Sequence, residues 1–268
     1  MNRIATIAAS FALALTLSFQ GHAANANDVT SLVAEGNPSI SAFSQKVGAK
    51  MRGFAKNGQQ ACSAVAVDPS TGNQKITMFL EGANPDCATQ DENTYSVHVN
   101  QNGKILVGFR EFVSNPNEDL EAFLVRISPQ AEAFTLNTGW EVCGFVAQNK
   151  DGKYGLRLAS TRGAVSCGMS ANNVPFGMTA TKMTYHTHPE GNARPTSADA
   201  EFYAENPAVS GRMLKVGKPL KVGVGGKGSA VFSEGDYVAP GYLVAEGKLM
   251  YQEGKGTERD VGHLSHSH

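Results

Sequence analysis

Four cysteines divide the chain into two loops of almost equal length, and this limits how the chain can fold. Cys62 and Cys87 are separated by nearly the same number of residues as Cys143 and Cys167. No pair forms a CxxC motif, so the spacing does not indicate a thiolate metal site. Four cysteines allow three pairings, and the matched spacing favours Cys62–Cys87 and Cys143–Cys167. Each disulfide would then contribute about 3 kcal/mol in the chain-entropy account of disulfide stability.

This interpretation depends on the N-terminal segment, which has the layout of a secretory signal peptide. Arg3 supplies a positive charge, an uncharged and mostly apolar run follows over 4–19, and Ala24-Asn25-Ala26 has the small residues that signal peptidase accepts. The apolar run is shorter than the ~20 residues that a transmembrane helix needs. We therefore expect a signal peptide at 1–26, no stable membrane anchor after its cleavage, and a secreted or periplasmic protein in an oxidising compartment.

The charge balance excludes some classes of partner. The chain has 23 Lys and Arg against 24 Asp and Glu, for a formal net charge of −1. Neither half carries a basic patch, so we expect no electrostatic binding of nucleic acid. The glycines at 223–228 do not follow the order of a phosphate-binding loop, and we expect no nucleotide site there. The length suits one large or two small domains.

The patterning alternates between helix and strand. Apolar residues three or four positions apart predict an amphipathic helix over 40–54. A second helical piece is expected at 117–125 or at 129–136. Runs typical of β-strands, separated by turn residues, cover 61–67, 75–80, 95–100, 104–112, 142–147, 154–159, 182–188 and the hairpin 242–250.

The two halves also resemble each other. The segment Ala61-Cys62-Ser63-Ala64-Val65-Ala66 lies over Val142-Cys143-Gly144-Phe145-Val146-Ala147, and Tyr95 to His98 falls near Tyr185 to His188. This suggests that the first half is a degenerate repeat of the second. Gln60 then stands where the second copy has Glu141, and the first copy would be structural.

One segment has the pattern of a metal site. His186 and His188 are two residues apart at the end of a predicted strand, so both imidazoles project from one face. Thr196 is expected to cap a following helix, with Asp199 in the first turn. Three such ligands with an open fourth position are typical of catalytic zinc. Taken alone, the Thr196-x-x-Asp199 spacing is better explained by a capping box without any metal.

The order of these motifs resembles the JAMM (JAB or MPN) zinc metalloprotease family. The similar stretches are Glu141-Val142-Cys143-Gly144-Phe145-Val146, His186-Thr187-His188-Pro189 and Thr196-Ser197-Ala198-Asp199. The resemblance implies that His186, His188 and Asp199 bind zinc. It implies that Glu141 holds and deprotonates the attacking water and passes the proton to the leaving amine. The Thr196 hydroxyl, with Ser197 as a possible substitute, would support the oxyanion.

The resemblance also implies a fold and a function. We expect an α+β, sandwich-like protein with a JAB/MPN-like mixed sheet flanked by helices over 129–252. A smaller α+β domain would precede it over 27–128, and a flexible His-containing tail would follow over 253–268. The implied function is a zinc-dependent peptidase or isopeptidase, and the signal peptide predicts that it is exported, whereas the family is mostly cytosolic. A ubiquitin-like protein or a cell-wall peptide is a candidate substrate. The alternatives are a non-catalytic binding module on the same fold and a metal-dependent amidase that acts on cell-wall material.

Overall fold

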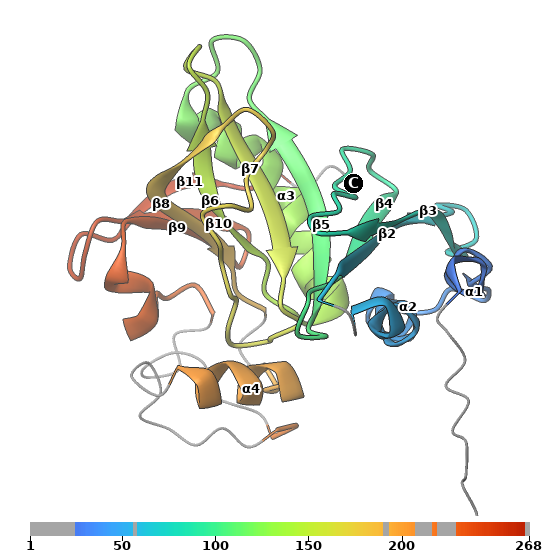
Figure 1. Cartoon of the computed structure of the whole chain (residues 1–268). Coiled ribbons are helices and arrows are strands. Elements are labelled where there is room, and N and C mark those ends of the chain that lie inside the picture. The colour runs from blue at the N-terminus through green and yellow to red at the C-terminus, as the bar shows by residue number, and fades with distance from the viewer. Residues whose placement is uncertain (1–24, 56–57, 190–192, 207–215, 219–228, 266–268) are drawn as a thin grey trace, which may run out of the picture.

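The structure, a computed structural model, describes residues 25–55, 58–189, 193–206, 216–218 and 229–265. Residues 1–24 of the predicted signal peptide lie outside this range. The described chain is a mixed α/β protein with few helices and one 11-stranded sheet (Figure 1).

The helices are α1 (Ala26–Thr30), α2 (Ile40–Ala55), α3 (Leu120–Thr138), α4 (Ser197–Glu205) and a 3-10 helix, η1 (Glu234–Val238). The strands are β1 (Val33–Ala34), β2 (Gln60–Val67), β3 (Gln74–Gly82), β4 (Thr94–Val99), β5 (Ile105–Val113), β6 (Cys143–Gln148), β7 (Tyr154–Ser160), β8 (Thr179–Thr187), β9 (Gly241–Ala245), β10 (Lys248–Gln252) and β11 (Arg259–His263).

The strands follow the order β1-β3-β2-β4-β5-β7-β6-β8-β9-β10-β11. Every neighbouring pair is antiparallel except β8 and β9, which run parallel. Helix α2 packs on β2, β4 and β5. Helix α3 packs on β5 and on β7 to β11, and Figure 1 shows it behind the sheet. The main apolar core lies between these two helices and the sheet.

Helix α3 is one continuous element where the sequence predicted either of two shorter pieces. The Asp119 side chain caps it by accepting a hydrogen bond from the Ala122 N–H at 2.8 Å, and Pro129 lies inside the helix. Buried side chains on both sides of the proline, Phe123 and Phe134 among them, form one apolar face against the sheet. That shared face keeps the helix intact, and the domain boundary predicted between 128 and 129 lies within it.

The contacts of α3 also decide which way β8 faces. The hydroxyls of Tyr185 and Thr187 lie 2.9 and 2.6 Å from hydroxyls on α3, and both side chains are buried. Since neighbouring residues of a strand point to opposite faces, His186 and His188 project away from α3. The two histidines therefore lie on the face of the sheet that the long helices leave free.

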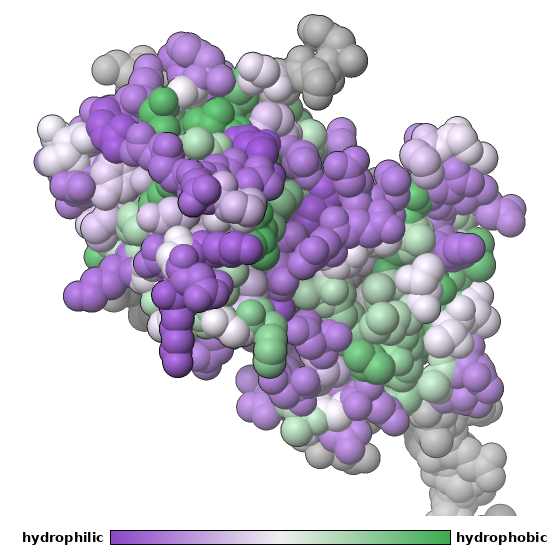
Figure 2. All heavy atoms as spheres, turned by 90° about the horizontal axis from the view of Figure 1, so that it is seen from above, coloured by the Kyte–Doolittle hydropathy of each residue, from purple (hydrophilic) through white to green (hydrophobic). Residues whose placement is uncertain are grey.

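Both predicted disulfides are confirmed. Cys62 is bonded to Cys87, and Cys143 is bonded to Cys167. Two disulfides indicate an oxidising, extracellular-type environment. Among the described helices, none is both long enough and apolar enough to span a bilayer. Figure 2 shows hydrophilic side chains over most of the face seen from above, with apolar side chains in separate patches.

The prediction of a flexible tail over 253–268 is wrong for 259–263, which form β11 against β10. Val261 packs against the main core, and Leu264 is buried with its N–H bonded to the Gly247 carbonyl at 2.8 Å. These two isolated apolar residues show no periodicity among charged and small neighbours, so the pattern could not reveal the strand. His266 and His268 lie outside the described residues.

Candidate metal centre

Two histidines and an aspartate converge on the face of the sheet opposite α2 and α3. Single ligand atoms of His186, His188 and Asp236 all lie within 4.8 Å of one another. The Nε2 atom of His186 is 3.3 Å from Asp236 Oδ1, and that of His188 is 3.8 Å from Asp236 Oδ2. Ligand atoms around a tetrahedral zinc ion, with bonds of about 2.0–2.1 Å, are roughly 3.3 Å apart. The group could therefore hold a metal ion with small adjustments.

The orientation of His188 suits a metal ligand. Its Nδ1 lies 2.9 Å from the carbonyl oxygen of Ser229, which can only accept a hydrogen bond. Nδ1 therefore carries the proton, and the Nε2 lone pair points into the group. The Ser229 N–H in turn donates to Glu246 Oε1 at 2.6 Å, which fixes the carbonyl from the β9–β10 turn. Burial, followed by the nearby His186, lowers the pKa of His188 to about 4, so its imidazole is neutral near pH 7.

His186 provides the observation that tests the fit of a metal. Its Nε2 atom is buried and makes no hydrogen bond to any described residue, although Asp236 Oδ1 lies 3.3 Å away. A buried polar atom without a partner normally costs free energy. Two imidazole nitrogens and a carboxylate form a donor set that zinc accepts, and a cation between them would satisfy the unpaired nitrogen.

Asp236, which the sequence analysis missed, is held in place by η1 and by a small apolar cluster. Its Oδ2 accepts a hydrogen bond from the Ser233 N–H at 2.6 Å. Phe232 and Tyr237 pack with Leu243 on the histidine face of the sheet, which brings η1 over β8. Burial alone would raise the pKa of Asp236, but the attraction of the two histidines and the Ser233 N–H outweigh it and lower the pKa.

Asp199, the predicted third ligand, lies outside this group. It is fully buried, and its oxygens accept hydrogen bonds from the backbone of Ala164 and Val165 and from the Ser166 hydroxyl, at 2.6–3.1 Å. Thr196 completes a capping box with Asp199 at the start of α4. The capping explanation is therefore confirmed. Metal ligation by Asp199 stays a prediction, and it would require the carboxylate to give up some of these bonds.

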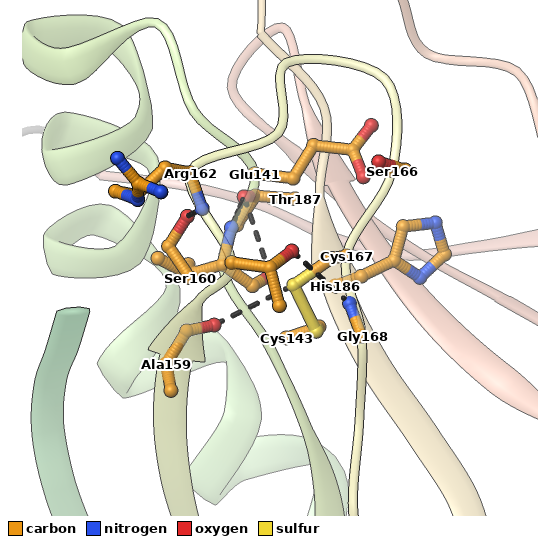
Figure 3. The surroundings of a disulfide bond; sticks show 12 residues. Glu141, Cys143, Ala159, Ser160, Arg162, Ser166, Cys167, Gly168, His186 and Thr187 are labelled. Carbon is orange, nitrogen blue, oxygen red and sulfur yellow. Dashed lines mark hydrogen bonds between the residues drawn. A yellow bond between two sulfur atoms is a disulfide. The ribbon is translucent and has the colours of Figure 1, made fainter. Parts of the chain in front are cut away.

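Glu141 lies beside the histidines, as the sequence predicted for the base. Its backbone N–H donates to the Gly163 carbonyl at 2.8 Å, and its Oε1 is 3.9 Å from His188 Nε2. Figure 3 shows Glu141 and His186 around the disulfide at the start of β6. Burial, followed by the negative charges of Asp236 and Asp199, raises the pKa of Glu141 well above its usual value.

The two predicted oxyanion donors, the hydroxyls of Thr196 and Ser197, make no described hydrogen bond with the metal-binding group. The Thr196 hydroxyl donates to the Arg162 carbonyl at 2.9 Å and accepts from the Asp199 N–H at 3.2 Å. Ser197 is the first residue of α4 and is exposed. No described hydrogen bond joins either hydroxyl to the histidines or to Asp236. Their role in supporting an oxyanion stays a prediction.

Comparisons with protein-family models, with curated proteins and with solved structures find no match to this chain.

Proposed function

We propose that the chain is an exported zinc-dependent metallopeptidase or isopeptidase, secreted or periplasmic, that hydrolyses an amide bond of a peptide or protein substrate. The observation that carries this proposal is the convergence of His186, His188 and Asp236 with Glu141 beside them. The fold we propose for this half is JAB/MPN-like, in keeping with the order of the Glu, His-x-His and Thr-x-x-Asp motifs.

In this proposal, metal binding and proton transfer are assigned to different residues. A bound zinc ion supplies a Lewis acid that polarises a carbonyl oxygen and lowers the pKa of water towards ~7. His186, His188 and Asp236 would bind that ion. Glu141 would accept the proton of the attacking water and donate it to the leaving amine. The position of Glu141 supports this role, because its Oε1 lies 3.9 Å from His188 Nε2, beside the proposed metal ligands.

We also propose that the N-terminal half is a degenerate repeat of the metal-binding half. In both halves a helix is followed by strands in the same spatial order, β3-β2-β4-β5 after α2 and β7-β6-β8-β9 after α3. In both, the first strand after the helix carries a cysteine that is bonded to the loop after the second strand. The halves differ in their last strand pair, which is antiparallel in the first half and parallel in the second.

The test is the metal content of the purified full chain beside a His186→Ala/His188→Ala variant. Both proteins keep the histidines near the C-terminus, so any zinc bound loosely there contributes equally to both measurements. We expect about one zinc per chain in the wild type and a loss of that zinc in the variant. Equal metal in both proteins would refute the site.

A Glu141→Gln variant tests the chemistry. It should keep its zinc and lose hydrolysis of peptide or isopeptide substrates by at least ~100-fold, because it removes the proton acceptor. Full activity in this variant would refute the assignment of the base. Wild-type protein that binds zinc but cleaves no substrate would indicate a binding module. Cleavage of cell-wall fragments alone would indicate an amidase.

A further inference from the structure

A cleft of about 440 Å³ opens where the N-terminal half meets β7 and the β7–β8 loop, a volume typical of ligand sites. Its lining includes Ser96 and His98 of β4 and Gly108 of β5. Ser96 Oγ and His98 Nε2 are 2.9 Å apart. A Cβ atom on Gly108 would lie 2.2 Å from Ser96 Oγ, so the glycine leaves room for this pair.

The walls of the cleft are two loops, and each is fastened by a disulfide. The β3–β4 loop is tied to β2 through Cys87, and the β7–β8 loop is tied to β6 through Cys167. Asp86 of the first loop also forms an ion pair with Arg157 of β7 at 3.2 Å. Both loops contribute lining residues, so the cleft is formed before any ligand binds.

The register of the sheet makes this cleft the counterpart of the metal centre. Cys62 of β2 pairs with His98 of β4, as Cys143 of β6 pairs with His186 of β8. In each half, the cysteine that pairs with the histidine across the two strands is also the strand cysteine of the disulfide. His98 therefore corresponds to His186, two residues away from His188, with which the sequence comparison aligned it.

The neighbouring positions show how the two sites diverged. Two residues before the cysteine, Gln60 corresponds to Glu141. Two residues after the histidine, Asn100 corresponds to His188. Gln60, His98 and Asn100 all line the cleft. The acid and the second imidazole are thus replaced by amides, which bind transition metals poorly but donate and accept hydrogen bonds.

We propose that this cleft is a non-catalytic binding site for an extended peptide segment. The Asn100 Oδ1 accepts the Asn102 and Lys104 N–H groups, so its NH₂ group is the part left to donate to a ligand, and the Gln60 amide, which donates to the Ala83 carbonyl at 2.8 Å, keeps its oxygen as an acceptor. Together they offer a donor and an acceptor, which matches a peptide group. None of the described residues that line the cleft is Phe, Tyr or Trp, so apart from the His98 imidazole this lining has no aromatic ring on which a sugar or a nucleobase could stack. Two of its basic side chains are already paired, Arg157 with Glu111 at 2.6 Å and Lys104 with Glu205. Arg110, another basic residue of the lining, already donates to Gln130 Oε1 and to the Glu92 carbonyl, so an anionic ligand gains little in this cleft.

The cleft and the metal centre share one face of the sheet. Gly108, Ala159, Cys143 and His186 are successive partners across β5, β7, β6 and β8. Three strand spacings of ~4.8 Å separate the ends of this row by about 14 Å. About four or five residues of extended chain cover that distance. That the bound peptide belongs to the substrate of the metal centre rests on the proposed function, whereas binding in the cleft does not.

The test is an NMR titration of the isotope-labelled full chain with N-acetyl-triglycine amide, and separately with N-acetylglucosamine. We expect saturable shifts of the His98 imidazole and the Gln60 side-chain amide with the peptide, and none with the sugar. Gln60→Ala should weaken the peptide affinity reported by His98 about three- to tenfold, for one lost hydrogen bond. Gln45→Ala, on the exposed side of α2, is the matched control and should leave it unchanged.

A second variant distinguishes the loss of a ligand contact from a folding defect. Asn100→Asp keeps the oxygen that accepts the turn bonds from the Asn102 and Lys104 N–H groups and replaces the amide donors with a negatively charged carboxylate oxygen. It should also weaken the peptide at His98. Shifts confined to residues near His186, or no shifts at all, would overturn the proposal. Shifts of His98 with the sugar would overturn the ligand class. Peptide binding at His98 by a chain that holds no zinc would support the proposal and refute the proposed function.

Discussion

The two candidate aspartates can be separated by the same conservative change, and zinc affinity is the decisive quantity. Asp236→Asn removes the negative charge from the carboxylate that lies 3.3 Å from His186 Nε2. Loss of a residue that merely supports a ligand costs about 10–100-fold in metal affinity. Loss of a charged ligand should reach the upper end of that range. We therefore expect zinc to bind about 100-fold more weakly, or about 2.7 kcal/mol.

Asp199→Asn should act on stability instead. The Asp199 carboxylate accepts hydrogen bonds from several N–H and O–H donors, among them the Ala164 and Thr196 N–H groups, both to Oδ2. An asparagine would either turn its own NH₂ group towards these donors or leave the Ser166 hydroxyl without its partner. A buried donor without an acceptor costs about 1–3 kcal/mol. We expect the free energy of unfolding to fall by about 3 kcal/mol in the metal-free protein.

The assay is competition for zinc against a chromophoric chelator, paired with urea unfolding in the presence of a strong chelator. The reasoning predicts that Asp236→Asn loses affinity and keeps its stability, whereas Asp199→Asn loses stability and keeps its affinity to within about threefold. A tenfold or greater loss of zinc affinity in Asp199→Asn, with wild-type affinity in Asp236→Asn, would refute the assignment. That result would place Asp199 at the metal, as the family resemblance implies.

Three further outcomes can be checked on the same preparations. Glu246→Ala removes the acceptor behind the carbonyl that orients His188, and zinc affinity measured by competition should fall about tenfold. The Cys143→Ala/Cys167→Ala pair should lower the free energy of unfolding in urea by about 3 kcal/mol, as expected for a loop of this length. Burial lowers the pKa of His98 to about 4 against 6.5 when unfolded, so the unfolded state binds the extra proton first. Up to about 3 kcal/mol of stability should be lost as the pH falls from 6.5 to 4, and a His98→Gln variant should show a smaller loss over that range.

Features set by short-range spacing were predictable from the sequence. The His186-x-His188 pair lies on one face because alternation along a strand requires it. The disulfides followed from matched cysteine spacing, since each closes a loop between a strand and the turn beyond its neighbour. The continuity of α3 was not predictable, because Pro129 is a strong local signal for a helix end. Only the apolar contacts with the sheet on both sides of it outweigh that signal.

The same limit explains why Asp236 was missed. Ser233-x-x-Asp236 and Thr196-x-x-Asp199 have the same capping pattern, and the local sequence cannot distinguish them. The difference is tertiary. The parallel pairing of β9 with β8 requires a long connection that returns before Gly241. Phe232 and Tyr237 anchor its last turn on the histidine face. One of the two aspartates is thereby used to hold α4 against its neighbouring loop, and the other is brought to the imidazoles by a contact between distant segments.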